Sequence, residues 1–161
     1  MAQSPSFREY GVQVIGERLQ KMLSYADAVR KAEDIEALHD MRVASRRLRA
    51  AIAIFAPAFR DPQFTRFERE VKALTDALGK ARDLDVMINT LRKLELDIVE
   101  AERAGIEGFI TRKCRERQNR QKDVLQALNR LQRRDLERWF AQIVAREDRT
   151  RYGAPEASTR V

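Results

Sequence analysis

The chain has 161 residues, of which 43% are hydrophobic and 35% charged, and its formal net charge is +7. This composition is too apolar for a disordered chain and too charged for a membrane protein, and the length suits one domain. One cysteine, Cys114, excludes an intramolecular disulfide, and one histidine, His39, excludes most zinc and haem ligand sets. We therefore predict a domain without a metal or cofactor. Residues 1–10 show no signal peptide, and the apolar stretch at residues 50–59 is too short to span a bilayer.

Apolar residues recur at helical spacing along the whole chain, whereas the alternation typical of strands is nearly absent. Helical segments are predicted at residues 10–31, 34–56, 64–78, 83–105, 106–134 and 136–146. Gly79 and Gly105 are expected to end helices, and Asp83 to cap the start of one. The predicted fold is an all-α, antiparallel helical bundle. We expect a single domain over residues 1–147, followed by a polar tail over residues 148–161.

The segment at residues 34–56 separates into a cationic face and an apolar face. On a helical wheel, one face carries His39, Arg42, Arg46 and Arg49. The opposite face carries Met41, Leu48, Ile52 and Phe55, whereas Arg47 belongs to neither. Stacked cations repel each other by a few tenths of a kcal/mol per pair, which an anion would relieve. The alternative is a solvated face with a structural histidine.

Basic residues are concentrated in a second region, residues 112–138, which contains ten basic and four acidic residues. This segment holds +6 of the net charge of +7, and a polyanionic partner is expected, although a solvated basic face is the alternative. Arg117 occupies a position in the apolar stripe of its helix, with Lys113 and Arg120 beside it. A cation there is costly unless it is paired or faces water. The pattern indicates a cavity lined with arginines, or an arginine at the edge of the bundle whose head reaches solvent.

Residues 39–50, HDMRVASRRLRA, resemble the signature of the CHAD family, the conserved-histidine α-helical domain, through the pattern HxxRVxxRRLR. Residues 78–86, LGKARDLDV, are similar to a second landmark of that family, and residues 127–129 to a third, looser one. The first motif is specific because it is long, whereas the second alone would be weak. The resemblance covers about residues 8 to 147.

This resemblance implies a helical module that binds inorganic polyphosphate in a central basic channel. It nominates six channel-lining residues: His39, Arg42, Arg46 and Arg49, with Arg82 and Arg47 as further candidates. We add Lys113, Arg117 and Arg120 as candidates, because Arg117 interrupts the apolar stripe of its helix and the other two lie beside it. The usual domain has two related helical halves, and this chain is similar to the first. We expect a homodimer in which two-fold symmetry replaces the second half; a chain cut from a longer protein is the alternative.

No catalytic motif accompanies these residues. The sequence lacks GxxxxGK[ST] and GxGxxG, and it lacks the ExExK strand of an enzymatic domain that often accompanies the family. We therefore predict a binding module and not an enzyme, located in the cytoplasm and associated with polyphosphate granules. A nucleic-acid-binding protein and a scaffold for an acidic protein partner are the competing classes. The 7% aromatic content weighs against nucleic acid, because most of these residues occupy predicted core positions.

Overall fold

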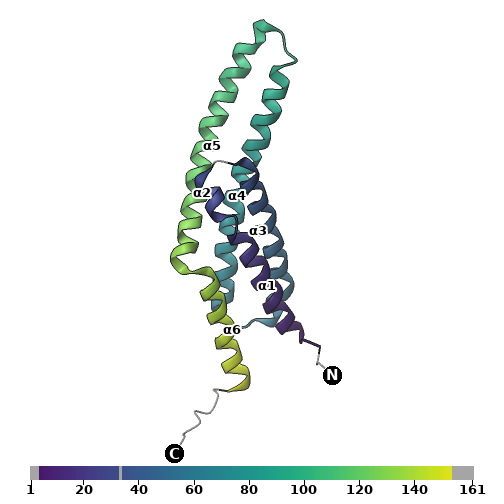
Figure 1. Ribbon diagram of the computed structural model, residues 1–161, viewed down its shortest axis with the longest axis vertical. Coiled ribbons are helices and arrows are strands. Elements are labelled where there is room, and N and C mark those ends of the chain that lie inside the picture. The colour runs from purple at the N-terminus through teal and green to yellow at the C-terminus, as the bar shows by residue number, and fades with distance from the viewer. Residues whose placement is uncertain (1–3, 33, 154–161) are drawn as a thin grey trace, which may run out of the picture.

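The structure, a computed structural model, describes residues 4–32 and 34–153. The described chain is helical, without strands, as the sequence predicted. The elements are α1 (Phe7–Leu23), α2 (Ala26–Lys31), α3 (Ile35–Phe55), the 3-10 turn η1 (Ala56–Ala58), α4 (Pro62–Glu95), α5 (Glu100–Arg134) and α6 (Leu136–Tyr152). The helices form an elongated bundle, and the end of α4 and the start of α5 extend beyond it as a two-helix projection (Figure 1). We call this projection, residues 86–115, the arm.

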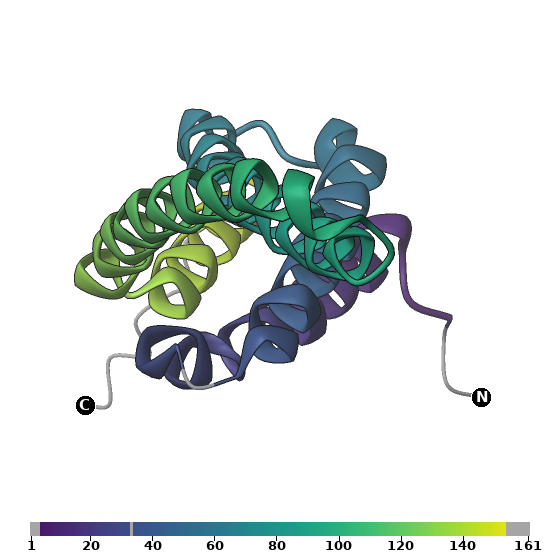
Figure 2. The same cartoon turned by 90° about the horizontal axis from the view of Figure 1, so that it is seen from above.

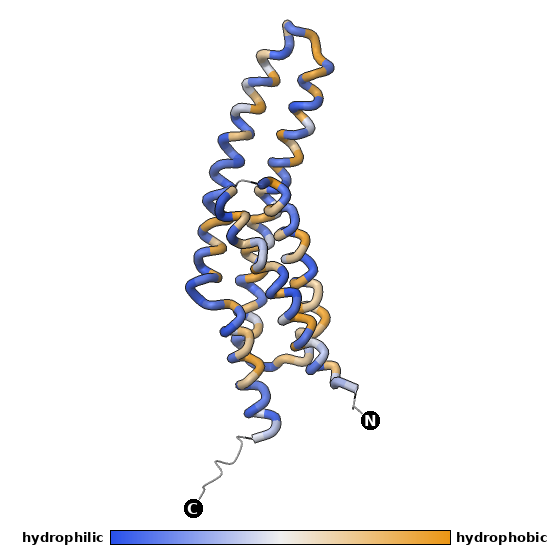
Figure 3. Tube along the Cα trace, in the orientation of Figure 1, coloured by the Kyte–Doolittle hydropathy of each residue, from blue (hydrophilic) through white to orange (hydrophobic). Residues whose placement is uncertain are grey.

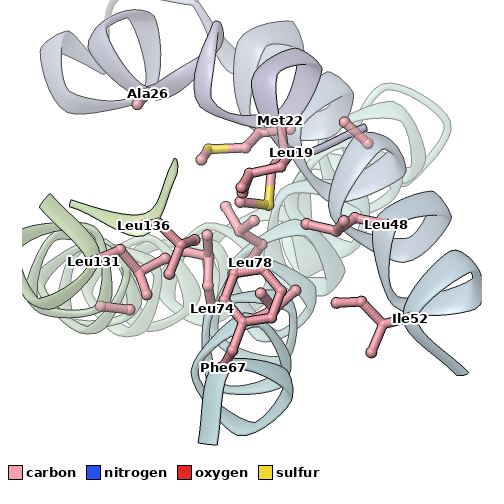
Figure 4. Packing of buried hydrophobic residues seen from close by; sticks show 14 of the residues in the cluster. Leu19, Met22, Ala26, Leu48, Ile52, Phe67, Leu74, Leu78, Leu131 and Leu136 are labelled. Atoms are coloured by element: carbon pink, nitrogen blue, oxygen red, sulfur yellow. The ribbon is translucent and has the colours of Figure 1, made fainter. Parts of the chain in front are cut away.

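Seen from above, the helices lie around a common centre (Figure 2), and their buried apolar side chains form one core cluster. In α4, Phe67, Leu74 and Leu78 lie in this core, and Leu48 and Ile52 of α3 pack into it from the other side (Figure 4). The helical segment predicted for residues 64–78 is part of α4 and buries its apolar residues, and the apolar face predicted for α3 is confirmed. Each long helix alternates between polar and apolar residues (Figure 3), and none in the described ranges is long and apolar enough to cross a membrane.

Two glycines that were predicted to end helices lie inside helices. Gly79 is in the middle of α4 and Gly105 is in α5, so the third and fourth predicted segments form one helix. The turn between α4 and α5 comes at residues 96–99, and Asp83 is an exposed mid-helix residue instead of a cap. A glycine ends a helix by adopting a positive φ, which neither glycine does. Its cost inside a helix is only about 1 kcal/mol, which the continuous core stripe of α4 outweighs.

Two further boundaries differ from those predicted. The first predicted segment breaks at Ser24 and Tyr25, between α1 and α2. The last helix continues to Tyr152, so the beginning of the predicted polar tail is helical, while residues 154–161 lie outside the described residues. The arginines and threonine of residues 149–151 are compatible with this helix because they lie on its exposed side.

The start of α4 is held by side chains from α6. Asp61 caps α4 by accepting a hydrogen bond from the Gln63 N–H, and its Oδ2 accepts another from Arg146 Nε at 2.6 Å. Burial alone would raise the pKa of the Asp61 carboxyl, but these two hydrogen bonds outweigh it and hold the pKa below its ordinary value. The buried Glu147 accepts hydrogen bonds from the backbone N–H groups of Arg60 and Asp61. These contacts fix the first turn of α4 against α6.

Replacing Asp61 by Asn keeps a good helix cap but removes the charge that faces Arg146. Because the pKa of Asp61 is lower in the folded than in the unfolded chain, the ionised carboxylate stabilises the fold above about pH 4, and this contribution is lost as the pH falls through the folded-state pKa. We expect Asp61→Asn to lower the melting temperature near neutral pH, and the difference from the wild type to shrink below about pH 4. Thermal unfolding followed across this range measures it. A difference independent of pH would contradict the ion pair.

Candidate functional site

Helix α3 is packed on α1 and on α4, and its arginines occupy the side that the core leaves free. Asp34 caps the helix by accepting a hydrogen bond from the Glu36 N–H, and Met41 and Leu48 are completely buried. Arg42 and Arg49 are half-buried, whereas Arg46 and Arg47 are exposed. The helix thus presents a basic outer surface, as the spacing predicted.

On one flank of this surface, α3 and α4 meet along a line of arginines, which we call the α3–α4 seam. Arg42 lies over Gly79, where an added Cβ would be 3.8 Å from its Nε. Arg49 Nη1 lies 3.7 Å from Asp76 Oδ1, and Arg82 Nη1 lies 3.9 Å from Glu36 Oε1. In both pairs the carboxylate side chain is more than half exposed, so water screens the attraction.

The other flank of α3 forms a groove with α1. This groove has a volume of about 530 Å³, and His39 and Arg47 line it from α3. Arg18 and Lys21 line it from α1, together with the acidic Glu17. His39 is half-buried, and its Nδ1 is buried without a hydrogen-bond partner among the described residues. His39 and Arg47 therefore share a groove, although the wheel placed His39 on the cationic face and Arg47 on neither face.

The three candidates on α5 are already engaged with acidic or amide side chains. Arg117 Nε donates to Asp85 Oδ1 at 2.6 Å, and its Nη1 donates to Gln121 Oε1 at 3.0 Å. The Asp85 side chain is 6% exposed and that of Arg117 is 17% exposed, so this is a nearly buried ion pair. Gln121 Nε2 in turn donates a hydrogen bond to the backbone oxygen of Val29 in α2. The pair therefore links α4, α5 and α2.

Lys113 and Arg120 each form an ion pair with an acidic side chain three residues later in α5. Lys113 Nζ lies 2.9 Å from Glu116 Oε2, and Arg120 Nη1 lies 3.2 Å from Asp123 Oδ2. Neither residue lines the α3–α4 seam or the α1–α3 groove. Pairs of this kind in solvent contribute only about 0.3–0.5 kcal/mol, so both cations can exchange their partner for another anion.

A pocket of about 460 Å³ lies where the arm leaves the bundle and continues the seam. Arg82 and Arg117 line it together with Arg92 and Cys114. Sequence reasoning missed Arg92, an exposed residue seven positions after Asp85 on the same side of α4. Arg18 and Lys21 were missed as well, and no local pattern marks them as partners of His39.

The nine predicted residues thus fall into three groups. The α3–α4 seam and its outer edge bring together Arg42, Arg46, Arg49 and Arg82. The α1–α3 groove brings together His39 and Arg47. The α5 residues Lys113, Arg117 and Arg120 form a third group, which Arg117 joins to the seam through the pocket that it shares with Arg82. No group of three or more His, Cys, Asp or Glu side chains suited to hold a metal ion occurs in the described part of the chain.

Comparison with known proteins gives one match. A family model described as CHAD domain matches residues 13–160, which is most of the chain and contains all nine predicted residues. No curated protein and no solved structure matches.

Removing the carboxylate of Asp85 would leave Arg117 without its buried partner. We expect Asp85→Ala to destabilise the fold by about 3–5 kcal/mol, because an unpaired, poorly hydrated charge remains. Asp83→Ala, two residues earlier and exposed, is the matched control and should change stability by less than about 0.5 kcal/mol. Urea denaturation of both variants measures the effect. Equal stability of the two would show that Asp85 does not hold Arg117, which would then be free for a ligand.

Proposed function

Because the chain belongs to the CHAD domain family, we propose that it binds inorganic polyphosphate as a non-catalytic module. One observation carries the proposal. Arg42, Arg46 and Arg47 lie on the outer side of α3, and none of them has an acidic partner within the described residues. Their charges repel each other along one short helix, and a bound anion would relieve that repulsion without first breaking an ion pair.

The spacing of these arginines suits a linear anion with a repeated charge. Along the axis of α3, Arg42 and Arg46 are about 6 Å apart, and Arg49 follows about 4.5 Å further on. Each guanidinium can donate two parallel hydrogen bonds to the oxygens of one phosphate, and such charge-assisted bonds contribute more than neutral ones. A phosphate chain lying along α3 would meet one guanidinium per turn of the helix.

The α3–α4 seam extends this track beyond α3. Arg49 and Arg82 would exchange the exposed Asp76 and Glu36 for phosphate, since these pairs are long and screened by water. The track then reaches Arg92 in the pocket at the start of the arm. Arg117 would contribute only the N–H groups that remain after its bonds to Asp85 and Gln121.

We assign His39 and Arg47 to a second wall of the same basic surface. They lie in the α1–α3 groove with Arg18 and Lys21, and the unpartnered His39 Nδ1 gives this groove a further polar atom. Lys113 and Arg120 would act from α5 after exchanging Glu116 and Asp123 for phosphate. A chain of phosphates would therefore run along α3, with the basic residues of α1, α4 and α5 on its flanks.

Binding of this kind should stabilise the fold. A ligand at 100 times its dissociation constant adds about 2.7 kcal/mol to the free energy of unfolding, which for a chain of this size raises the melting temperature by about 5–10 °C. We expect this rise with long-chain polyphosphate, and a smaller one at higher salt because the contacts are electrostatic. Thermal scans at two salt concentrations measure it. No shift at low salt, with the ligand in excess, would contradict polyphosphate binding.

Removing the arginines of α3 should weaken binding without unfolding the chain. We expect Arg42→Ala and Arg46→Ala each to reduce the affinity for polyphosphate about tenfold or more, since each loses a charge-assisted contact. Arg138→Ala is the control, because Arg138 is exposed like Arg46 and lies in α6, which contributes no residue to the proposed basic surface. Isothermal titration and circular dichroism of the three variants test this. Equal losses in all three would indicate attraction by net charge alone, without a site on α3.

A further inference from the structure

The arm carries more exposed apolar surface than the rest of the described chain. Six of the eleven exposed large hydrophobic residues lie on it: Val86, Met87, Leu94, Leu96, Val99 and Phe109. At its tip, Leu96 is 80% exposed and Val99 is 65% exposed. Met87 and Leu94 share one face of α4, about 200° around the helix from the stripe that Asp85 and Arg92 occupy. The arm that carries these residues projects from the bundle (Figure 3), and exposed apolar residues on such a projection indicate an interaction site.

Charge divides the arm into two unlike ends. Its tip, residues 95–102, contains four acidic residues and no basic one: Glu95, Asp97, Glu100 and Glu102. Its base on α5, residues 109–115, contains three basic residues and no acidic one: Arg112, Lys113 and Arg115. At the base, the Phe109 ring is flanked by Arg112 and Lys113, whose cationic groups lie 5.5 Å and 5.4 Å from its centroid. Glu100 pairs with Arg103 and Lys113 pairs with Glu116, so the remaining charge is that of Glu95, Asp97 and Glu102 at the tip and of Arg112 and Arg115 at the base. The two ends therefore carry apolar residues and charges of opposite sign.

We propose that the arm pairs with the arm of a second copy of this chain, in antiparallel orientation. In that arrangement the acidic tip of each copy, with Leu96 and Val99, covers the basic base of the other, with Phe109. The two ends are about 15 Å apart along α5, since Val99 precedes Phe109 by ten residues. An overlap of that length brings both tips onto both bases at once.

A second copy fits this surface better than an unrelated partner. A two-fold axis makes the same patch serve on both sides, so one tip and one base per chain satisfy each other reciprocally. The whole chain has a formal net charge of +7, so two copies repel each other at long range. The acidic tips provide attraction to the basic bases where the two arms overlap. This pairing does not rest on polyphosphate binding, because its contacts lie on the arm and need no ligand.

The test is sedimentation velocity over a range of protein concentrations, without polyphosphate. We expect a dimer for the wild type, and at least about tenfold weaker association for the tip variant Asp97→Lys/Glu102→Lys. The base variant Arg112→Glu/Arg115→Glu should associate as weakly as the tip variant. Its substitutions leave the turn between α4 and α5 unchanged. Glu137→Lys is the matched control, since it reverses an exposed acid in the first turn of α6, as Glu102 is in the first turn of α5. It should dimerise like the wild type.

The decisive step of this experiment is to mix the tip variant with the base variant. In the mixed pair the tip with Asp97→Lys/Glu102→Lys meets the base with Arg112→Glu/Arg115→Glu, so each substituted position faces substituted positions of opposite charge. The unchanged acidic tip meets the unchanged basic base. We expect the mixture to form a heterodimer that is tighter than the association of either variant with itself. A wild type that stays monomeric at the highest concentration would overturn the proposal. So would a mixture that stays monomeric, or a loss of association in Glu137→Lys equal to that in the arm variants.

Discussion

The burial of one side of α3 determines where its arginines can lie. Met41, Leu48 and Ile52 are completely buried in the core, and a helix that buries these positions must turn the residues between them toward the outside. Arg42, Arg46 and Arg49 are those residues. Their mutual repulsion would favour separation, but the rigid helix holds them together, and the free energy for this comes from the apolar face. The basic surface is thus a consequence of the core.

The length of α4 and α5 has two consequences. Because α4 runs without a break from Pro62 to Glu95, it carries the seam that flanks α3 and then continues past the end of the bundle. The pair Asp85–Arg117 stands at this point and ties α4 to α5 where the support of α2 and α3 ends. Beyond it, the two helices of the arm cover only each other, which leaves their outer apolar residues exposed. The helices α4 and α5 therefore both flank the basic surface of α3 and form an arm with opposite charges at its ends.

The parts of this structure that the sequence predicts are those that depend on local periodicity. The apolar face of α3 and the buried apolar residues of α4 follow from 3.6-residue spacing, and the structure confirms them. The predicted cationic face of α3 is divided, because His39 lies in the α1–α3 groove whereas Arg42 and Arg49 lie in the α3–α4 seam. Gly79 was misread because a helix-ending glycine is recognised by its φ, which depends on whether the helix on either side is packed. The Arg117 position was recognised as unusual, but its partner Asp85 lies 32 positions away on another helix, and no local pattern reveals that pairing. The α1–α3 groove likewise arises from the way in which two helices pack, so the neighbours of His39 in this groove could not be predicted from the sequence.

The account depends most on the claim that this basic surface recognises a flexible phosphate chain and not merely any polyanion. Arginines held at fixed intervals on one helix suit a narrow chain that can lie along the seam, whereas a duplex DNA is too wide to follow it and would be attracted mainly by net charge. The most direct measurement is the displacement of labelled duplex DNA by long-chain polyphosphate, with both at equal phosphate concentration and at near-physiological salt. The account predicts that polyphosphate displaces nearly all of the DNA. Retention of the DNA under these conditions would contradict it and would favour a nucleic-acid-binding protein.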